Sequence, residues 1–357
     1  AGVGAGVVSV GGMELEQAQK LWQPEPGWLN TATYGLPPEP VWDAVQRVLA
    51  DWRTGRVSFE VWEEAVDRSR AAFARLTGVD VADVSIGASA SQLVAPIAAG
   101  LPAGATVVVP ETEFTSILFP WLVQQDRGVR VRTVPLAGLV DAIDADTDLV
   151  AFSVVQSADG TVLPYDEIVA AARAHGAFVV ADATQACGWL PFAADRADAV
   201  VVGAYKWLMS PRGSAFAYLA PALRERMRPD AAGWYAGREP HASYYGLPLR
   251  LADDARRFDI APPWLSYAGT APALELLADL DPEAVRAYDV GLANRFLTGL
   301  GRPPGDSAIV SVDVPDAQER LARAGVRAAV RAGRVRASFH LYTTEADVDR
   351  AVEALTG

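Results

Sequence analysis

The stretch FVVADATQACGWLPFAADRADAVVVGAYKWL, residues 178–208, decides the fold. It opens with an apolar run that ends at Asp182, and a second apolar run at 199–203 ends just before Tyr205 and Lys206. Short apolar runs of this kind are typical of buried strands in a parallel sheet. Because open α/β sheets bind ligands at the carboxyl ends of their strands, both charged residues are expected at a binding site.

The same alternation of short strands and helices extends to both sides of this stretch. It predicts an α/β fold with a mostly parallel sheet that helices cover on both faces. The segment 214–219 follows Gly203 too closely for a crossover helix, so we expect it to run antiparallel. The other predicted strands are 84–87, 106–110, 129–134, 149–155, 178–182 and 199–203, and the predicted helices are 40–55, 59–77, 90–99, 116–125 and 165–175.

The pattern changes after residue 280, and it predicts four parts of the chain. Residues 1–13 are small and rich in Gly and Val, and we expect a disordered leader there. Residues 14–30 are expected to form an arm that packs with the small domain, and residues 31–280 the large domain. Residues 281–357 predict a small α+β domain whose last helix, 345–355, has Thr344 as its N-cap. Its other predicted elements are helices 283–299 and 316–324 and strands 309–314, 327–332 and 335–338.

Composition excludes several classes of partner and site. The formal net charge of −13 over 357 residues disfavours nucleic acid and anionic membrane surfaces. There is no apolar run of about 18 residues, which argues against a membrane-spanning helix. The single cysteine, Cys187, excludes an internal disulfide and a multi-cysteine metal site, and it fits a reducing cytoplasm.

Asp182 and Lys206 are the first candidates for chemistry. A lysine at the end of a buried strand is costly to desolvate unless it is neutralised or bonded covalently, and its pKa falls readily there. A lysine amine and a carboxylate are the pair that pyridoxal phosphate (PLP) requires, for its aldehyde and its pyridine nitrogen. On spacing alone, a structural salt bridge or two unrelated surface charges is the simpler explanation.

A second motif, Gly-Ala-Ser-Ala-Ser-Gln at 87–92, follows a predicted strand and opens a helix. Small residues let the backbone approach an anion, the hydroxyls of Ser89 and Ser91 add donors, and the helix N-terminus carries partial positive charge. The motif predicts a phosphate site, although serine before a helix is also an ordinary cap.

Together these motifs resemble the class V aminotransferases, a group of PLP enzymes that includes the cysteine desulfurases and kynureninase. The likeness rests on Asp-Ala-Thr-Gln-Ala at 182–186 and Tyr-Lys-Trp at 205–207, and it extends from Leu29 nearly to the C-terminus. It implies the PLP-dependent transferase fold type I, with a seven-stranded type of sheet in the large domain. It also implies a homodimer.

The resemblance implies a role for each site residue. Lys206 forms the Schiff base with PLP, Asp182 holds the pyridine nitrogen, Gln185 lies near the phenolic oxygen, and Phe114 stacks on the ring. The implied cofactor-binding set is Ser89, Ala90, Phe114, Ser157, Asp182, Gln185, Tyr205 and Lys206.

Three further segments match the family on the substrate and partner sides. Arg336, in the pattern Arg-Ala-Ser, would hold the substrate carboxylate, a task that suits a planar bidentate donor. Thr33 and Tyr34 follow a segment that resembles the one beside the substrate. The segment 257–259 resembles one that reaches toward the phosphate of a partner subunit.

The departures from the family pattern narrow the reaction. Tyr205 stands where histidine is common, Gly203 replaces a phosphate-binding serine, Ser157 replaces an asparagine, and Pro262 replaces a threonine that faces the partner. The catalytic-cysteine loop of the desulfurases is absent, and Cys187 is expected to be a packed core residue. Desulfuration would therefore lack its nucleophile.

Within the family, the chain most resembles the PLP-dependent carbon–sulfur lyase of actinobacterial ergothioneine biosynthesis. The resemblance implies cleavage of hercynylcysteine sulfoxide, a small sulfur amino acid, with release of pyruvate and ammonia. A class V aminotransferase, a kynureninase-like hydrolase, an epimerase and a catalytically silent binding module are the alternatives.

Other residues have less specific interpretations. His340 is expected to line the site near Arg336 or to lie on the surface. His175 is expected at the C-terminus of a helix. The aromatic residues of 234–264 are expected in the core or as a wall for the substrate, with Tyr34, Trp234 or Trp264 as candidate contacts for its trimethylammonium group.

Overall fold

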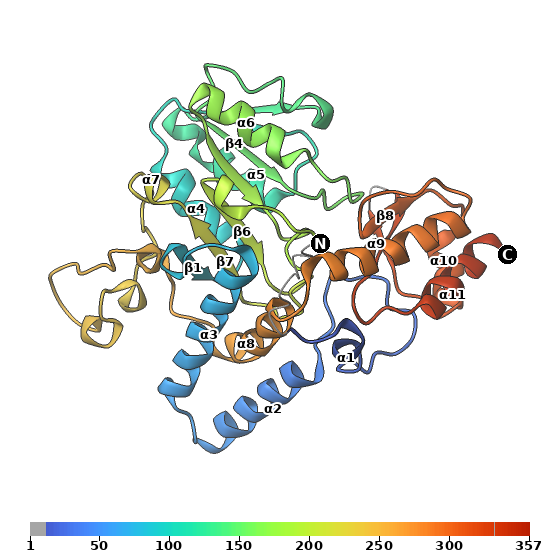
Figure 1. The fold of residues 1–357 in the computed structure, drawn as a ribbon. Helices are drawn as coiled ribbons and strands as arrows, with labels where there is room; N and C mark the ends of the chain where they lie inside the picture. Colours follow the sequence, from blue (N-terminus) through green and yellow to red (C-terminus); the bar gives the residue numbers. More distant parts are fainter. Residues whose placement is uncertain (1–11, 332) are drawn as a thin grey trace, which may run out of the picture.

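The central sheet has the strand order β1-β7-β6-β5-β4-β2-β3 (Figure 1). Its pairings are parallel apart from those of β7, which runs antiparallel to β1 and to β6. The mostly parallel seven-stranded sheet and the antiparallel strand after Gly203 are thus confirmed. The computed structural model describes residues 12–331 and 333–357. The strands are β1 Val84–Gly87, β2 Thr106–Pro110, β3 Arg130–Val134, β4 Leu149–Ser153, β5 Phe178–Asp182, β6 Ala199–Gly203 and β7 Ala215–Leu219.

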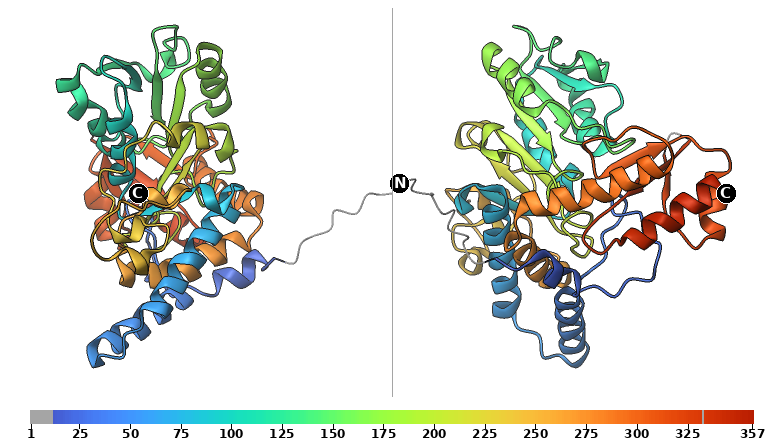
Figure 2. Two further views of the ribbon diagram at one scale, coloured as in Figure 1. Left: turned by 90° about the vertical axis from the view of Figure 1, so that its left-hand side faces the viewer. Right: turned by 45° about the vertical axis from the view of Figure 1, so that its right-hand side comes forward.

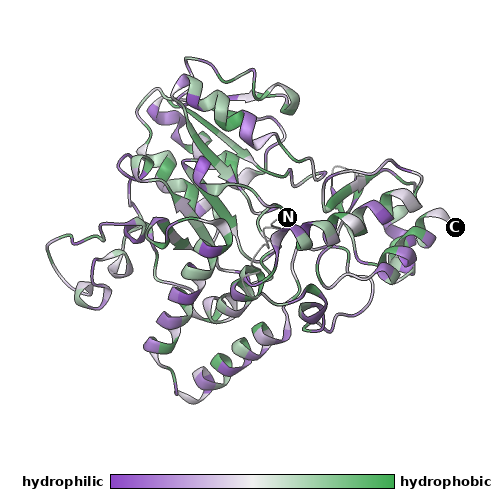
Figure 3. Ribbon diagram, viewed as in Figure 1, coloured by the Kyte–Doolittle hydropathy of each residue, from purple (hydrophilic) through white to green (hydrophobic). Residues whose placement is uncertain are grey.

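Helices pack on both faces of this sheet. Neighbouring side chains of a strand point to opposite faces, so Val107 and Val109 pack with α4 and α5, whereas Val108 belongs to the cluster with α3, α6 and α8. Figure 3 shows the strands as the apolar centre of the domain. The helices are α2 Glu39–Thr54, α3 Phe59–Thr77, α4 Ala90–Gly100, α5 Thr115–Leu122, α6 Tyr165–His175, α7 Pro221–Arg224 and α8 Trp264–Ala278.

Several predicted boundaries differ from those in the structure. The helix expected at 116–125 is divided, because α5 ends at Leu122 and a 3-10 turn, Val123–Arg127, leads into Gly128 with a φ of 81°. The strand expected at 149–155 ends at Ser153, since Val155 pairs instead with Val162 in an isolated bridge.

The small domain packs three helices against a three-stranded antiparallel sheet of order β8-β10-β9. Its core is a separate hydrophobic cluster. Thr344 caps α11 in a capping box with Asp347, which confirms the predicted N-cap. The elements are α9 Pro282–Gly299, β8 Ile309–Val312, α10 Ala317–Arg323, β9 Ala329–Arg331, β10 Arg334–Ser338 and α11 Glu345–Thr356.

The N-terminal arm contacts both domains. It contains α1, Leu15–Gln19, and the backbone of Leu29 exchanges hydrogen bonds with Arg327 and Ser338 of the small domain. Trp22 packs in the core of the large domain. The division at residues 14, 31 and 281 stays a prediction, and residues 1–11 of the expected leader lie outside the described residues.

Helices α2, α3 and α8 form a layer that extends away from the sheet (Figure 2). No described helix combines the length and the apolar character needed to cross a bilayer.

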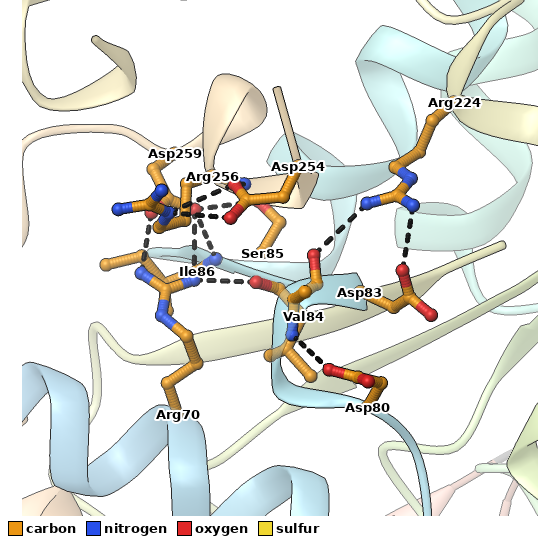
Figure 4. A network of polar contacts seen from close by, with 11 residues as sticks. Arg70, Asp80, Asp83, Val84, Ser85, Ile86, Arg224, Asp254, Arg256 and Asp259 are labelled. Atoms are coloured by element: carbon orange, nitrogen blue, oxygen red, sulfur yellow. Dashed lines mark hydrogen bonds and ion pairs between the residues drawn. The ribbon is translucent and has the colours of Figure 1, made fainter. Parts of the chain in front are cut away.

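A buried ion pair ties this layer to strand β1 (Figure 4). Arg70 of α3 lies 2.6 Å from Asp259, and the two side chains are 6% and 1% exposed. Asp259 also accepts hydrogen bonds from the Ser85 hydroxyl and the backbone N–H of Ile86. Asp259 therefore points into the core of its own chain, and it fixes β1 just before Gly87, where the predicted phosphate motif begins.

We expect the Arg70→Met substitution to lower the free energy of unfolding by about 3–5 kcal/mol, because it leaves the Asp259 carboxylate buried without a counter-ion. Arg75→Met is the matched control, since the Arg75–Asp279 pair is half exposed on the same helix and should contribute at most about 1 kcal/mol. Denaturant unfolding of both variants measures the difference. Equal losses would show that the buried pair has no special role.

Candidate active site

Asp182 and Lys206 lie together at the carboxyl edge of the sheet. Asp182 is the last residue of β5, and Lys206 follows the neighbouring strand β6 by three residues. Asp182 is 5% exposed and Lys206 is 7% exposed. The two charges that the sequence placed at strand ends therefore share one buried site.

Burial sets the protonation of both groups. It lowers the pKa of Lys206 to about 8, against the opposing effect of the Asp182 charge. Burial also raises the pKa of Asp182, while hydrogen bonds from Thr184 act in the opposite direction. A lysine with this pKa supplies an appreciable fraction of neutral, nucleophilic amine near neutral pH.

Two aromatic rings flank the lysine. The Nζ atom of Lys206 lies 5.5 Å from the centroid of the Phe114 ring and 5.6 Å from that of Tyr205. Phe114 follows β2, is about half exposed and lines the same cavity as the lysine, so its ring is accessible to a planar ligand there.

Glu113 fixes the turn that carries Phe114. Its buried carboxylate accepts hydrogen bonds from the N–H groups of Phe114 and Ser153 and from the side chains of Ser153 and Gln156. Burial raises the pKa of Glu113, and these donors oppose the rise. The ring-stacking position is thereby tied to the ends of β2 and β4.

Gln185 is held by four partners. Its Oε1 atom accepts a hydrogen bond from the Trp207 indole at 2.8 Å, and Nε2 donates to the Ala32 carbonyl at 3.0 Å and to the Ser157 hydroxyl at 3.2 Å; its own carbonyl accepts the Trp189 indole N–H. Both amide hydrogens thus have acceptors within the chain, and the Gln185 side chain is held in place at the edge of the cavity.

Ser89 is the N-cap of α4, and its hydroxyl accepts the N–H of Gln92 at 3.4 Å. The cap and the phosphate interpretations of this motif are compatible. The first N–H groups of an 11-residue helix, beginning at Ala90, point toward the end of the cavity that Ser89 lines.

Arg336 is a buried cation on β10. It is 1% exposed, and its guanidinium donates to Ser157 and, at 2.8 Å, to the Thr33 hydroxyl. These are neutral acceptors, and no described carboxylate forms an ion pair with it. Burial lowers the pKa of Arg336 to about 10. The Arg336 guanidinium therefore has no negatively charged partner among the described residues.

One cavity brings the predicted residues together. All eight residues of the predicted cofactor-binding set line it. The three predicted substrate residues lie next to it. Arg336 and Thr33 are joined to the lining residue Ser157 by hydrogen bonds, and Tyr34 packs on Tyr205 with ring centroids 5.8 Å apart.

Known sequences match this chain over most of its length. The family described as aminotransferase class-V matches residues 30–319. The chain belongs to this family.

Relatives of this class V aminotransferase family member differ in their activities. Isopenicillin N epimerase of Streptomyces clavuligerus is 28% identical, over 98% of this chain and 100% of the epimerase. A probable cysteine desulfurase of Aeropyrum pernix is 27% identical over 72% of this chain and 73% of the desulfurase.

Solved structures confirm the predicted fold type I. A cystine C–S lyase in complex with cysteine persulfide superposes with a TM-score of 0.83 at 21% identity, covering 93% of this chain and 97% of the lyase. The cysteine desulfurase CsdA of Escherichia coli gives 0.81 at 21% identity, covering 96% and 97%.

Family membership makes the chain a PLP-dependent enzyme, and its described residues fit that cofactor. Lys206 supplies an amine of depressed pKa, Asp182 a buried carboxylate, and Phe114 a half-open ring. The end of the cavity at Ser89 and Ala90 offers hydroxyl and backbone donors for a phosphate.

Arg212 is a cavity residue that the sequence analysis missed. Its guanidinium lies over the Tyr205 ring, 4.7 Å from the centroid, and it lines the cavity with Ser89 and Ala90. Its position six residues after Lys206, in the turn before β7, could have indicated that it lies near the lysine. Thr184 was missed as well; its hydroxyl accepts the N–H of Gly203 at 2.9 Å.

Both expectations for His340 were wrong. The residue is fully buried and lines neither the cavity nor the surface. Its ring contacts Asp289 of α9 at 2.7 Å and the Trp207 carbonyl at 3.0 Å. The cause is domain packing, which places the end of β10 against the residue that follows Lys206.

Two other expectations hold. Cys187 is buried among core residues, and burial raises the pKa of its thiol to about 12. His175 ends α6 next to Gly176.

The aromatic cluster packs on itself. The Tyr235 ring contacts the rings of Trp234 and Trp264, and none of the three lines the cavity. The substrate-wall interpretation is therefore wrong for these three rings.

We expect PLP to attach to the apoprotein at a rate that follows the neutral fraction of Lys206. The rate should rise about tenfold per pH unit below pH 8 and level off above it, because the pKa is about 8. Stopped-flow absorbance measures this. Since the folded pKa lies below the unfolded value, the unfolding free energy of the apoprotein, relative to Lys206→Met, should rise by about 3 kcal/mol between pH 8 and 10.5. A rate that still climbs at pH 10 would contradict the assigned environment.

We expect Arg212→Met to weaken PLP binding by about tenfold, the size of one charge-assisted hydrogen bond. Pyridoxal, which has no phosphate, is the control ligand, and its affinity should stay within about twofold. Equilibrium dialysis of both ligands separates the two cases. An equal loss for both would assign Arg212 to positioning Tyr205 instead.

Proposed function

We propose that this enzyme is a carbon–sulfur β-lyase that cleaves hercynylcysteine sulfoxide, releasing pyruvate, ammonia and a sulfenate that becomes ergothioneine on reduction. The observation that carries the proposal is the buried Arg336 guanidinium, which lies beside the Lys206 cavity without a carboxylate partner among the described residues. An α-amino acid would bring that carboxylate to the site.

The sulfur chemistry rests on the position of Cys187. This thiol is buried in the core, its pKa is raised to about 12, and it does not line the cavity. Without a thiolate, a sulfur group has to leave by itself. A sulfoxide leaves as a stabilised sulfenate, and this supports a sulfoxide over a simple thioether.

The residues of the chain supply binding and proton transfer. Arg336 binds the α-carboxylate through a pair of charge-assisted hydrogen bonds. Lys206, with a pKa of about 8, takes the proton from Cα. PLP, when bound, would supply an electron sink for that carbon, and the buried Asp182 carboxylate is the residue that would hold its pyridine nitrogen. The Cβ–S bond then breaks with its electron pair on sulfur.

An epimerase is the second candidate, because isopenicillin N epimerase aligns with 98% of this chain. Both reactions begin with removal of the Cα proton. They differ in the next step, since an epimerase returns a proton to Cα and leaves the Cβ bond intact. The homodimer stays a prediction from the resemblance, and the cytoplasmic location stays a prediction from the single cysteine.

Addition of hercynylcysteine sulfoxide to the PLP-loaded protein should release pyruvate, measured with lactate dehydrogenase. Lys206→Ala should abolish release. Arg336→Gln should lower kcat/KM by about a hundredfold, since it removes a buried charged partner. Cys187→Ala should stay within about twofold, because the proposed reaction uses no thiol.

Two outcomes would refute the lyase. Exchange of the Cα hydrogen in D₂O without pyruvate would favour the epimerase, and conversion of PLP to its amine form would favour an aminotransferase. Separately, loss of pyruvate release in Cys187→Ala would contradict an elimination that uses no thiol.

A further inference from the structure

Three arginines lie on one face of the β9–β10 hairpin. Arg331 and Arg334 are direct cross-strand partners in the antiparallel register, and Arg336 lies two residues further along β10. Cross-strand partners, and residues two apart on a strand, share a face of the sheet. On this face, the buried Arg336 is therefore followed, toward the hairpin turn, by the exposed pair Arg331 and Arg334.

This arrangement costs stability, and described residues do not offset it. Like charges directly opposite in a sheet are destabilising. The guanidinium of Arg334 donates to the hydroxyl and carbonyl of Ser311, and that of Arg331 to the carbonyl of Val330. These are neutral acceptors. In a chain of net charge −13, such a pair indicates a place for an anion.

A groove runs between this hairpin and the turn after β4. It has a volume of about 460 Å³, and Gln156 and Asp159 line it together with Arg331 and Arg334. Asp159 is the one carboxylate among its lining residues, so two cations outnumber one anion. Ser157, between the groove residues Gln156 and Ala158, lines the PLP cavity, so residues of one turn border both spaces. Strand β4, which precedes this turn, and the small domain with β8 are labelled in Figure 1.

The charge of Arg331 also affects the pKa values of Arg336 and Lys206. It contributes to the lowered pKa of Arg336 and of Lys206, in each case after the larger effect of burial. Arg331 thus adds to the positive potential that draws anionic ligands to this opening.

We propose that Arg331 and Arg334 form a subsite for a second carboxylate of the substrate, which would make the natural substrate a cysteine S-conjugate with a distal acid group. The inference rests on the proposed amino-acid site at Arg336. Two residues of extended strand span roughly 7 Å, so the distal carboxylate would lie about that far, or slightly further, from the α-carboxylate. The betaine carboxylate of hercynylcysteine sulfoxide is a group of this class.

Two matched probes test the subsite without turnover of the natural substrate. S-(2-carboxyethyl)-L-cysteine carries a distal carboxylate, and S-propyl-L-cysteine has the same chain length without it. Calorimetric titration of the PLP-loaded protein should give at least a tenfold tighter Kd for the carboxylate probe. The preference should shrink at high salt, because the pair is exposed.

The double variant Arg331→Gln/Arg334→Gln should reduce the preference to less than twofold and leave the Kd of S-propyl-L-cysteine unchanged. Arg323→Gln is the matched control, since this arginine is exposed on α10 of the same domain, and it should retain the full preference. Equal affinities in the wild type, or a preference that survives in the double variant, would overturn the subsite.

Failure of the lyase gives a different result. If the preference follows the variants as stated but sulfoxide substrates yield no pyruvate, the subsite stands and the reaction is wrong. If neither probe binds, the amino-acid site at Arg336 and the subsite are both overturned.

Discussion

A lysine amine buried beside a carboxylate at the carboxyl edge of a parallel sheet is the constraint on which the site depends. Parallel strands bring their carboxyl ends to one edge of the sheet. Because β5 and β6 are neighbours, Asp182 and Lys206 lie close together at that edge. Burial disfavours the charged form of both side chains, and it lowers the pKa of the Lys206 amine to about 8. The same edge presents the Phe114 turn and the N-terminus of α4 to the lysine.

Around this pair the site carries more positive than negative charge. Lys206, Arg212 and Arg336 face or adjoin a cavity in which Asp182 is the acidic lining residue. Buried cations without counter-ions are unfavourable. Phosphate and carboxylate groups of the ligands would supply the missing charge, so cofactor and substrate binding complete the electrostatics of the folded chain. Binding of these anionic ligands should therefore also stabilise the folded chain.

The small domain is connected to the reacting lysine through a chain of hydrogen bonds. Asp289 contacts His340, and His340 contacts the carbonyl of Trp207, the residue after Lys206. The Trp207 indole in turn holds Gln185. A carbonyl only accepts, so the His340 Nε2 atom must carry a hydrogen in this arrangement. These contacts link the packing of the small domain to the positions of Lys206 and Gln185.

The sequence by itself determined what depends on local pattern. Apolar runs and turn residues located the strands, the antiparallel β7 and the Thr344 cap, and strand ends singled out Asp182 and Lys206. The resemblance to the family supplied the remaining cofactor residues, and all eight line one cavity. Family motifs supplied their roles. Contacts between distant segments were decided only by the tertiary structure, because no periodicity encodes which side chains meet across long separations. They are the Arg70–Asp259 pair, the His340 contacts, the place of Arg212 and the shared face of Arg331, Arg334 and Arg336.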